Sequence, residues 1–104
     1  MISKKKILQR IKKDILDLIP GAEVVLFGSR ARDDHHEESD WDILVLIDSK
    51  VTHKLKRQVS DKLFYISLEF EICINTLTIN KNDWNGKFKY YPLHFEIEKD
   101  GMVI

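Results

Sequence analysis

Residues 24–48 read VVLFGSRARDDHHEESDWDILVLID, and this stretch decides the fold. Its first four residues are β-branched, aliphatic or aromatic and end at Gly28, a pattern typical of a strand buried on both faces. Asp42 to Asp48 enclose a second apolar run, which predicts a second buried strand. Between the two strands, Ser29 to Arg32 are predicted to form a short helix with Ser29 as its cap, followed by a polar loop.

The flanking sequence carries helical patterns and one more strand pattern. Apolar residues that recur every three or four positions indicate amphipathic helices, and strict alternation of apolar and polar residues indicates a strand. The expected elements are a helix after Ser3 that ends at Pro20, a helix over 50–65 capped by Ser49, a strand over 68–79, a turn over 80–83 and a helix over 93–100. Helices that alternate with strands predict a layered α/β fold.

Length and composition exclude several classes of protein. The 104 residues suffice for one domain, which we expect to span residues 1–104. Seventeen basic and 17 acidic side chains give zero net charge, which argues against strong nucleic-acid binding through a uniformly basic surface. The longest apolar run, residues 43–47, is far shorter than the ~20 residues that span a bilayer, and no signal peptide is expected. The single cysteine, Cys73, cannot form an internal disulfide, so we expect a core thiol in a cytoplasmic protein.

Asp40 and Asp42 are the residues that predict chemistry. Residues two apart in a strand point to the same face, with Cα atoms about 6.5–7 Å apart. Their carboxylates repel each other unless a divalent cation lies between them, and oxygen ligands favour Mg²⁺ or Mn²⁺. Upstream, the turn at Gly28 and Ser29 presents backbone N–H groups at the start of a helix, which is a place that binds phosphate.

The spacing from Gly28-Ser29 to Asp40-Trp41-Asp42, with ten residues between, resembles the signature of the DNA-polymerase-β-like nucleotidyltransferase superfamily. Within it, the short chain is similar to the minimal nucleotidyltransferases, known as MNT proteins. The resemblance implies a palm-like fold in which helices flank a small mixed sheet. It also implies that Gly28 and Ser29 hold the phosphates of ATP while Asp40 and Asp42 bind two Mg²⁺ ions. The family often has glycine where this chain has Asp33.

Two further site assignments rest on helix and strand geometry. Ser29 and Arg32 lie three residues apart and share a helix face, so Arg32 is expected to face the nucleotide and Arg30 to face solvent or an acidic neighbour. The superfamily also uses a third carboxylate on a neighbouring strand as a general base and metal ligand. Glu71 is the first candidate for this role and Glu69 the second, unless both form the solvent face of an edge strand.

The resemblance implies transfer of AMP from ATP to a hydroxyl of a partner protein, with tyrosine as the favoured acceptor. The implied partner is a small helical HEPT-type toxin, for which MNT proteins act as antitoxins. One alternative is a non-catalytic module that keeps the fold and neutralises or scaffolds a partner, and another is a transferase acting on a small molecule or RNA. The sequence leaves the base preference open, is compatible with a homo-oligomer, and does not decide which of Trp84, Tyr90 or Tyr91 stacks on a base.

Overall fold

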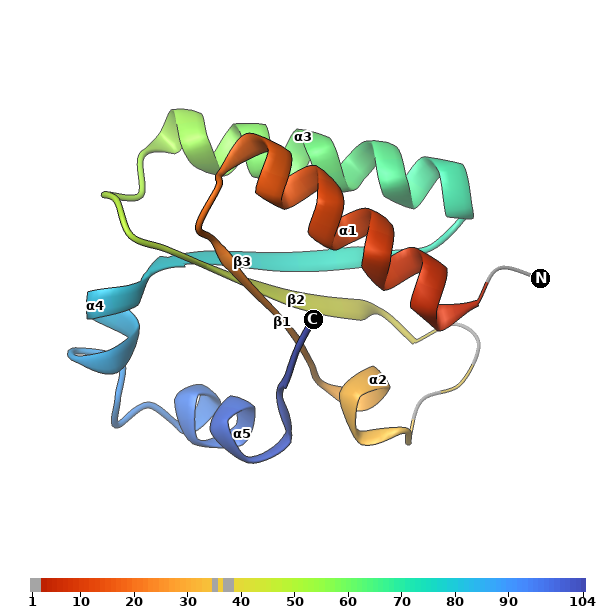
Figure 1. Cartoon of the computed structure of the whole chain (residues 1–104). Coiled ribbons are helices and arrows are strands. Elements are labelled where there is room, and N and C mark those ends of the chain that lie inside the picture. Colours follow the sequence, from red (N-terminus) through yellow and green to blue (C-terminus); the bar gives the residue numbers. More distant parts are fainter. Residues whose placement is uncertain (1–2, 35, 37–38) are drawn as a thin grey trace.

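The computed structural model describes residues 3–34, 36 and 39–104. Its elements follow the chain in an alternating order (Figure 1). They are α1 (Lys4–Leu18), β1 (Glu23–Phe27), α2 (Ser29–Arg32), β2 (Trp41–Ile47), α3 (His53–Phe70), β3 (Ile74–Asn80), α4 (Lys81–Asn85), α5 (Pro92–Asp100) and β4 (Met102–Val103). None of the described helices is long and apolar enough to cross a membrane.

The four strands form one mixed sheet in the order β3-β2-β1-β4. Strand β1 runs antiparallel to both β2 and β4, whereas β2 and β3 are parallel and are connected through α3. The register places Asp42 beside Phe27 of β1 and beside Asn75 of β3. The predicted small mixed sheet flanked by helices is therefore confirmed.

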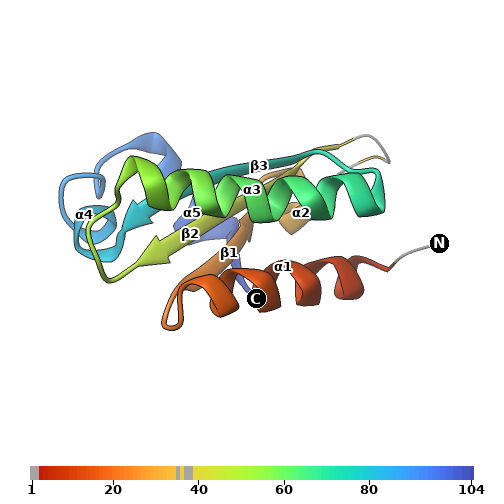
Figure 2. The ribbon, with the colours of Figure 1, turned by 90° about the horizontal axis from the view of Figure 1, so that it is seen from above.

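The two faces of the sheet are covered to different extents. Helices α1 and α3 lie side by side across one face (Figure 2), where Ile43, Val45 and Ile47 of β2 join the larger apolar core. The other face carries the smaller core around Leu44 and Leu46, which packs against the α4–α5 region. Asp42 has the same strand parity as Leu44, so its side chain lies on this second face, at the end of the strand where that core stops.

The third predicted strand begins later than its alternating pattern indicated. Helix α3 continues to Phe70, Glu71 ends it in a left-handed conformation with φ of 55°, and the strand starts only at Ile74. The buried stripe of the helix, Val59, Leu63 and Ile66, extends at the same spacing to Phe70, which packs against the core. The helix therefore extends to Phe70 because this places the Phe70 side chain against the core, although residues 68–74 alternate in the manner of a strand.

Most helix ends agree with the sequence, with two caps displaced. Ser3 caps α1 as predicted, and Pro92 and Gly101 bound α5. The cap of α3 is Thr52, whose hydroxyl accepts a hydrogen bond from the Leu55 N–H, and not Ser49. Helix α2 is capped by Gly28, one residue before the predicted Ser29, and the predicted turn over 80–83 opens the short helix α4.

Candidate active site

Asp40 and Asp42 converge on one atom of a neighbouring strand. The Asn75 side-chain Nδ2 donates to Asp40 Oδ2 at 2.8 Å and to Asp42 Oδ1 at 3.3 Å. This arrangement follows from the sheet, because Asn75 lies beside Asp42 in the parallel register of β2 and β3. The two carboxylates supply oxygen ligands of the kind that Mg²⁺ and Mn²⁺ prefer, so Asp40 and Asp42 fit a divalent cation.

Asn75 is a site residue that sequence reasoning missed. It stands on β3 where the superfamily pattern led us to expect an acid, and the described residues contain no group of three or more His, Cys, Asp or Glu side chains that could hold a metal ion. A signal was present, because Asn75 has the same strand parity as the acids that were considered. However, Asn75 lies beside Asp42 only because of the register between β2 and β3, and that register depends on the geometry of the α3 connection between the two strands.

Gly28 brings the start of α2 against the carboxylate of Asp42. Its φ of 75° is a left-handed value that glycine adopts readily, and an added Cβ would collide with the Asp42 side chain. Strand pairing explains the proximity, because Phe27, immediately before Gly28, pairs with Asp42. The turn therefore brings the half-buried Ser29 and the first residues of α2 next to the carboxylate pair.

Arg30 is a second residue whose role was missed. Its guanidinium is buried, lies 4.2 Å from the centre of the Trp41 ring, and donates through Nε and Nη2 to the Ser39 carbonyl at 3.0 and 2.9 Å. Burial lowers the pKa of Arg30, and attraction to Asp40 opposes that effect. The solvent-facing alternative is wrong. Arg30 instead fixes the residues immediately before and after Asp40.

Arg32 is exposed and donates from Nε to Asp34 Oδ2 at 3.1 Å. The position after it, Asp33, adopts a left-handed conformation with φ of 60° at the end of α2. This backbone explains why glycine is common there in the family, and aspartate is among the residues that tolerate it. Aspartate in place of glycine at position 33 therefore keeps the turn. The orientation of Arg32 toward a nucleotide stays a prediction.

Glu69 and Glu71 do not lie on a strand, so the geometry on which we ranked them is wrong. Glu69 is in the last turn of α3 and accepts from Arg10 Nη1 of α1 at 2.8 Å. Glu71 follows the helix and lines a cavity of about 610 Å³ together with Ser39 and Cys73. The structure therefore places Glu71 at the margin of the site without joining it to the two aspartates in a metal cluster.

Cys73 is exposed and is not the core thiol that we expected. A hydrogen bond to Asp40 raises the pKa of the Cys73 thiol, and repulsion of the thiolate by Asp40 and Asp42 acts in the same direction. The side chain lies just before β3, two residues from Asn75, and so borders the site.

The aromatic residues considered for stacking on a base differ in how deeply they are buried. Trp84 belongs to the smaller core, as Trp41, buried beneath Arg30, belongs to the larger one. Tyr90 and Tyr91 are exposed in the segment before α5. His35, one of two adjacent histidines in the polar loop that follows α2, lies outside the described residues.

Comparisons with known proteins identify the family of the chain. Residues 8–100 match the model of the family described as the nucleotidyltransferase domain. Two proteins of Methanocaldococcus jannaschii, both provisionally named as protein adenylyltransferases, are 36% and 31% identical to this chain over 78 and 101 residues. The first alignment covers 73% of this chain and 79% of the relative, and the second covers 97% and 85%.

Solved structures share the fold at lower identity. A toxin-antitoxin with AMP-PNP aligns with a TM-score of 0.67 at 21% identity, covering 91% of this chain and 69% of that chain. Two variants of the MntA-HpeT toxin-antitoxin each align with a TM-score of 0.61. One has two aspartates, two positions apart, changed to glutamate; it is 16% identical, and the alignment covers 98% of this chain and 71% of that chain. The other has one tyrosine changed to alanine; it is 18% identical, with 100% and 72% covered.

The family model spans almost the whole chain, and both archaeal relatives align over most of their length. The paired aspartates beside the Gly28 turn are the residues through which the chain resembled this family at the outset. The chain therefore belongs to the nucleotidyltransferase domain family.

Proposed function

We propose that this protein transfers AMP from ATP to a hydroxyl group of a partner protein. The observation that carries the proposal is the convergence of Asp40 and Asp42 on one point of a sheet face, with the Gly28 turn packed against them. The two archaeal relatives named as protein adenylyltransferases support this reaction, and the AMP-PNP complex of a structural neighbour supports an adenine nucleotide as the donor.

We assign Asp40 and Asp42 as the residues that hold two Mg²⁺ ions, with Mn²⁺ as a substitute. The side-chain NH₂ of Asn75 donates to both carboxylates and holds them together, so we assign Asn75 as a residue that positions the two metal-binding aspartates. When bound, the cations supply positive charge that offsets the charge of the triphosphate and of the leaving pyrophosphate. With an amide in place of a third carboxylate, the site carries one negative charge fewer. Less repulsion therefore has to be offset by a cation before the site can form.

The other residues bind and orient the reactants. Gly28 leaves room for the Asp42 carboxylate beside the start of α2, and Ser29 and Arg32 bind the phosphates. The acceptor oxygen forms a bond to the α-phosphorus while the bond to pyrophosphate breaks, and the hydroxyl proton passes to a carboxylate. Glu71 is our candidate base, because it borders the site beside Ser39 and Cys73, whereas Glu69 is engaged by Arg10.

We propose that the whole chain acts as one minimal domain in the cytoplasm and that its acceptor is a small helical HEPT-type toxin. The toxin-antitoxin neighbours support a protein partner. The MntA-HpeT variants change one tyrosine and a pair of aspartates, which are the residue types that we propose for the acceptor and for the metal site.

A second function is favoured by one observation. Asn75, which carries no charge, lies beside Asp42 on the neighbouring strand, and the two acids that were expected on that strand lie outside it, which suits a module that binds and neutralises its partner without catalysis. The two functions differ in whether a covalent bond to the partner is formed.

The decisive experiment incubates the chain with α-labelled ATP, Mg²⁺ and the product of the neighbouring gene. We expect label on the partner, and loss of that label with Asp42→Asn. Asp48→Asn is the matched control, because Asp48 follows the other end of the same strand and is exposed. Stable binding of the partner with no label from any of the four nucleotides would establish the non-catalytic function instead.

A further inference from the structure

The cavity of about 610 Å³ that Cys73 lines opens directly beside the paired aspartates. The Cys73 thiol forms a hydrogen bond with Asp40, and the Cys73 carbonyl accepts one from the N–H of Trp41 at 2.8 Å. Ser39, on the other side of Asp40, lines the same cavity. Pockets that hold small ligands have volumes of about 300–1,000 Å³. The cavity is therefore large enough for one reactant and touches the proposed reaction centre.

The walls of this cavity are held by contacts within the chain. Arg30, which lines it, is only 9% exposed, and its guanidinium donates to the Ser39 carbonyl through two nitrogens. On the opposite wall, the Ser67 hydroxyl donates to a carbonyl of the preceding turn of α3 at 2.6 Å. The Ser67 carbonyl accepts from the N–H of Glu71, which ends the helix. The cavity is therefore preformed.

The sheet order determines from which side an acceptor can approach. In an in-line displacement, the attacking oxygen and the leaving pyrophosphate lie on opposite sides of the α-phosphorus. The proposed function places the triphosphate at the start of α2, which lies on the β1 side of Asp42 because Phe27 pairs with Asp42. Strand β3 lies on the other side of β2. The acceptor therefore has to approach from the β3 side, where Cys73 and the cavity lie.

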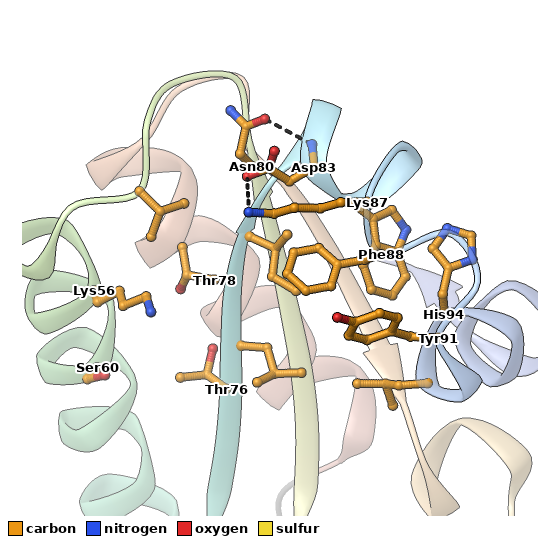
Figure 3. Close-up of a pocket in the computed structure, with 15 residues that line it drawn as sticks. Lys56, Ser60, Thr76, Thr78, Asn80, Asp83, Lys87, Phe88, Tyr91 and His94 are labelled. Carbon is orange, nitrogen blue, oxygen red and sulfur yellow. Dashed lines mark hydrogen bonds and ion pairs between the residues drawn. The ribbon is translucent and has the colours of Figure 1, made fainter.

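A second hollow on β3 lies farther from the aspartates and differs in chemistry. This groove, of about 510 Å³, follows the strand over residues 76–80, with Ser60 of α3 on one side (Figure 3). The carboxylate among its described lining residues belongs to Asp83 and is paired with Lys87 at 3.8 Å. Glu71, in the first cavity, forms no ion pair with any described residue. The first cavity therefore offers a carboxylate that can take the acceptor proton.

The surroundings of the cavity favour a protein as the acceptor. Leu68 lines its rim and is 60% exposed, and Phe64, one turn earlier on the same face of α3, is 58% exposed. Neighbouring exposed apolar side chains mark a surface that another protein covers. An RNA acceptor is disfavoured, because the carboxylates of Glu71, Asp40 and Asp42 outnumber the one guanidinium and repel phosphate groups.

We propose that this cavity is the acceptor subsite, and that the acceptor side chain of the partner protein enters it between the last turn of α3 and Cys73. Phe64 and Leu68 contact the partner surface around that side chain. The inference rests on the proposed function, which supplies the reaction. The acceptor oxygen forms its bond to the α-phosphorus as the bond to pyrophosphate breaks, and the hydroxyl proton passes to the Glu71 carboxylate.

The first test fills the cavity. Ser67→Trp should reduce the transfer of label from α-labelled ATP to the product of the neighbouring gene by about tenfold or more, because the acceptor is displaced from the phosphorus. ATP binding in calorimetry should be unchanged. Ser60→Trp is the matched control, because Ser60 lies two turns earlier on the same face of α3, in the groove of Figure 3, and should leave both measurements unaltered. Undiminished transfer by a folded Ser67→Trp variant would overturn the proposal.

The second test does not depend on catalysis. Cys73 is the single cysteine of the chain, so its alkylation by iodoacetamide can be followed by mass spectrometry. The bound partner should slow this alkylation severalfold. Leu68→Glu should abolish the protection, whereas Phe95→Glu, on the exposed face of α5, should keep it. Equal alkylation with and without the partner overturns the inference, whether or not label is transferred. Protection without transfer refutes the proposed reaction and leaves the docking site standing.

Discussion

The two faces of the sheet divide stability from chemistry. On the face beneath α1 and α3, Ile43, Val45 and Ile47 are completely buried. On the other face, the same strand begins with the half-buried Asp42, beside the exposed Asn75. One face thus holds the strands in register, and the other can place two carboxylates together at low cost because water still reaches them. The comparison teaches that a small domain can hold two like charges together on one face of its sheet when the opposite face is well packed.

The largest expected effect is on the packed face. Ile43→Ala removes a completely buried side chain and should lower the free energy of unfolding by about 2–5 kcal/mol, because it leaves a cavity under α1 and α3. Urea denaturation monitored by circular dichroism measures this change. Phe95→Ala, at a side chain that is 71% exposed, should change the free energy by no more than about 0.5 kcal/mol. Equal effects from the two variants would refute the division between the faces.

The next largest effect is at the turn that meets Asp42. Gly28→Ala forces a strained left-handed residue and a collision with the carboxylate, so it should cost about 1–3 kcal/mol and abolish Mg²⁺-nucleotide binding in calorimetry. Gly21→Ala is the matched control, because Gly21 also has a positive φ, of 99°, but a Cβ there makes only ordinary contact with Asp48. Nucleotide binding should survive in that variant. Its loss in both would show that the collision at Gly28 is not the cause.

A smaller effect sharpens the role of Asn75. Asn75→Asp adds a third carboxylate at the point where Asp40 and Asp42 converge, so Mg²⁺ affinity should rise about tenfold, equivalent to about 1.4 kcal/mol. Calorimetric titration with Mg²⁺ checks the change. Asn82→Asp, at an exposed position on α4, adds the same charge away from the site and should leave the affinity unaltered. Unchanged affinity in Asn75→Asp would remove Asn75 from the metal site.

The smallest effect is a shift in the titration of Cys73. A hydrogen bond to the Asp40 carboxylate favours the protonated thiol and raises its pKa. Asp40→Asn removes the negative charge, so the thiolate becomes more stable and the pKa falls. At a fixed pH below the pKa, alkylation by iodoacetamide should then be severalfold faster. Glu98→Gln serves as a distant control, and an identical pH profile in wild type and Asp40→Asn would contradict the contact.

Local patterns predicted the parts of the fold that depend on local sequence. The two central strands follow from runs of apolar residues, and Asp40 and Asp42 follow from their spacing of two at the start of β2. Local patterns also predicted the first and last helices, because Ser3 and Pro92 act only on their own helix starts.

The rest depended on contacts between distant segments. Asn75 becomes part of the site through a strand register that the sequence does not state, and Arg30 is buried because Trp41 supplies a surface for it. Glu71 was placed on a strand because alternation over a few residues also occurs at the end of a helix. Phe70 continues the buried stripe of α3 and packs against the larger core, and this tertiary contact extends the helix through residues whose alternation indicated a strand.

The crossover through α3 has a consequence for the order in which the molecule assembles. The side chains that meet at the site, Asp42 and Asn75, are 33 residues apart along the chain. Early local structure, including the antiparallel pair of β1 and β2, can form without that contact, whereas closing so long a loop is entropically costly and slow. In a chain that is still folding, the Asn75 amide therefore does not yet lie beside the carboxylates. Nucleotide capture should consequently appear only with the last native contacts, which would prevent half-folded molecules from sequestering ATP.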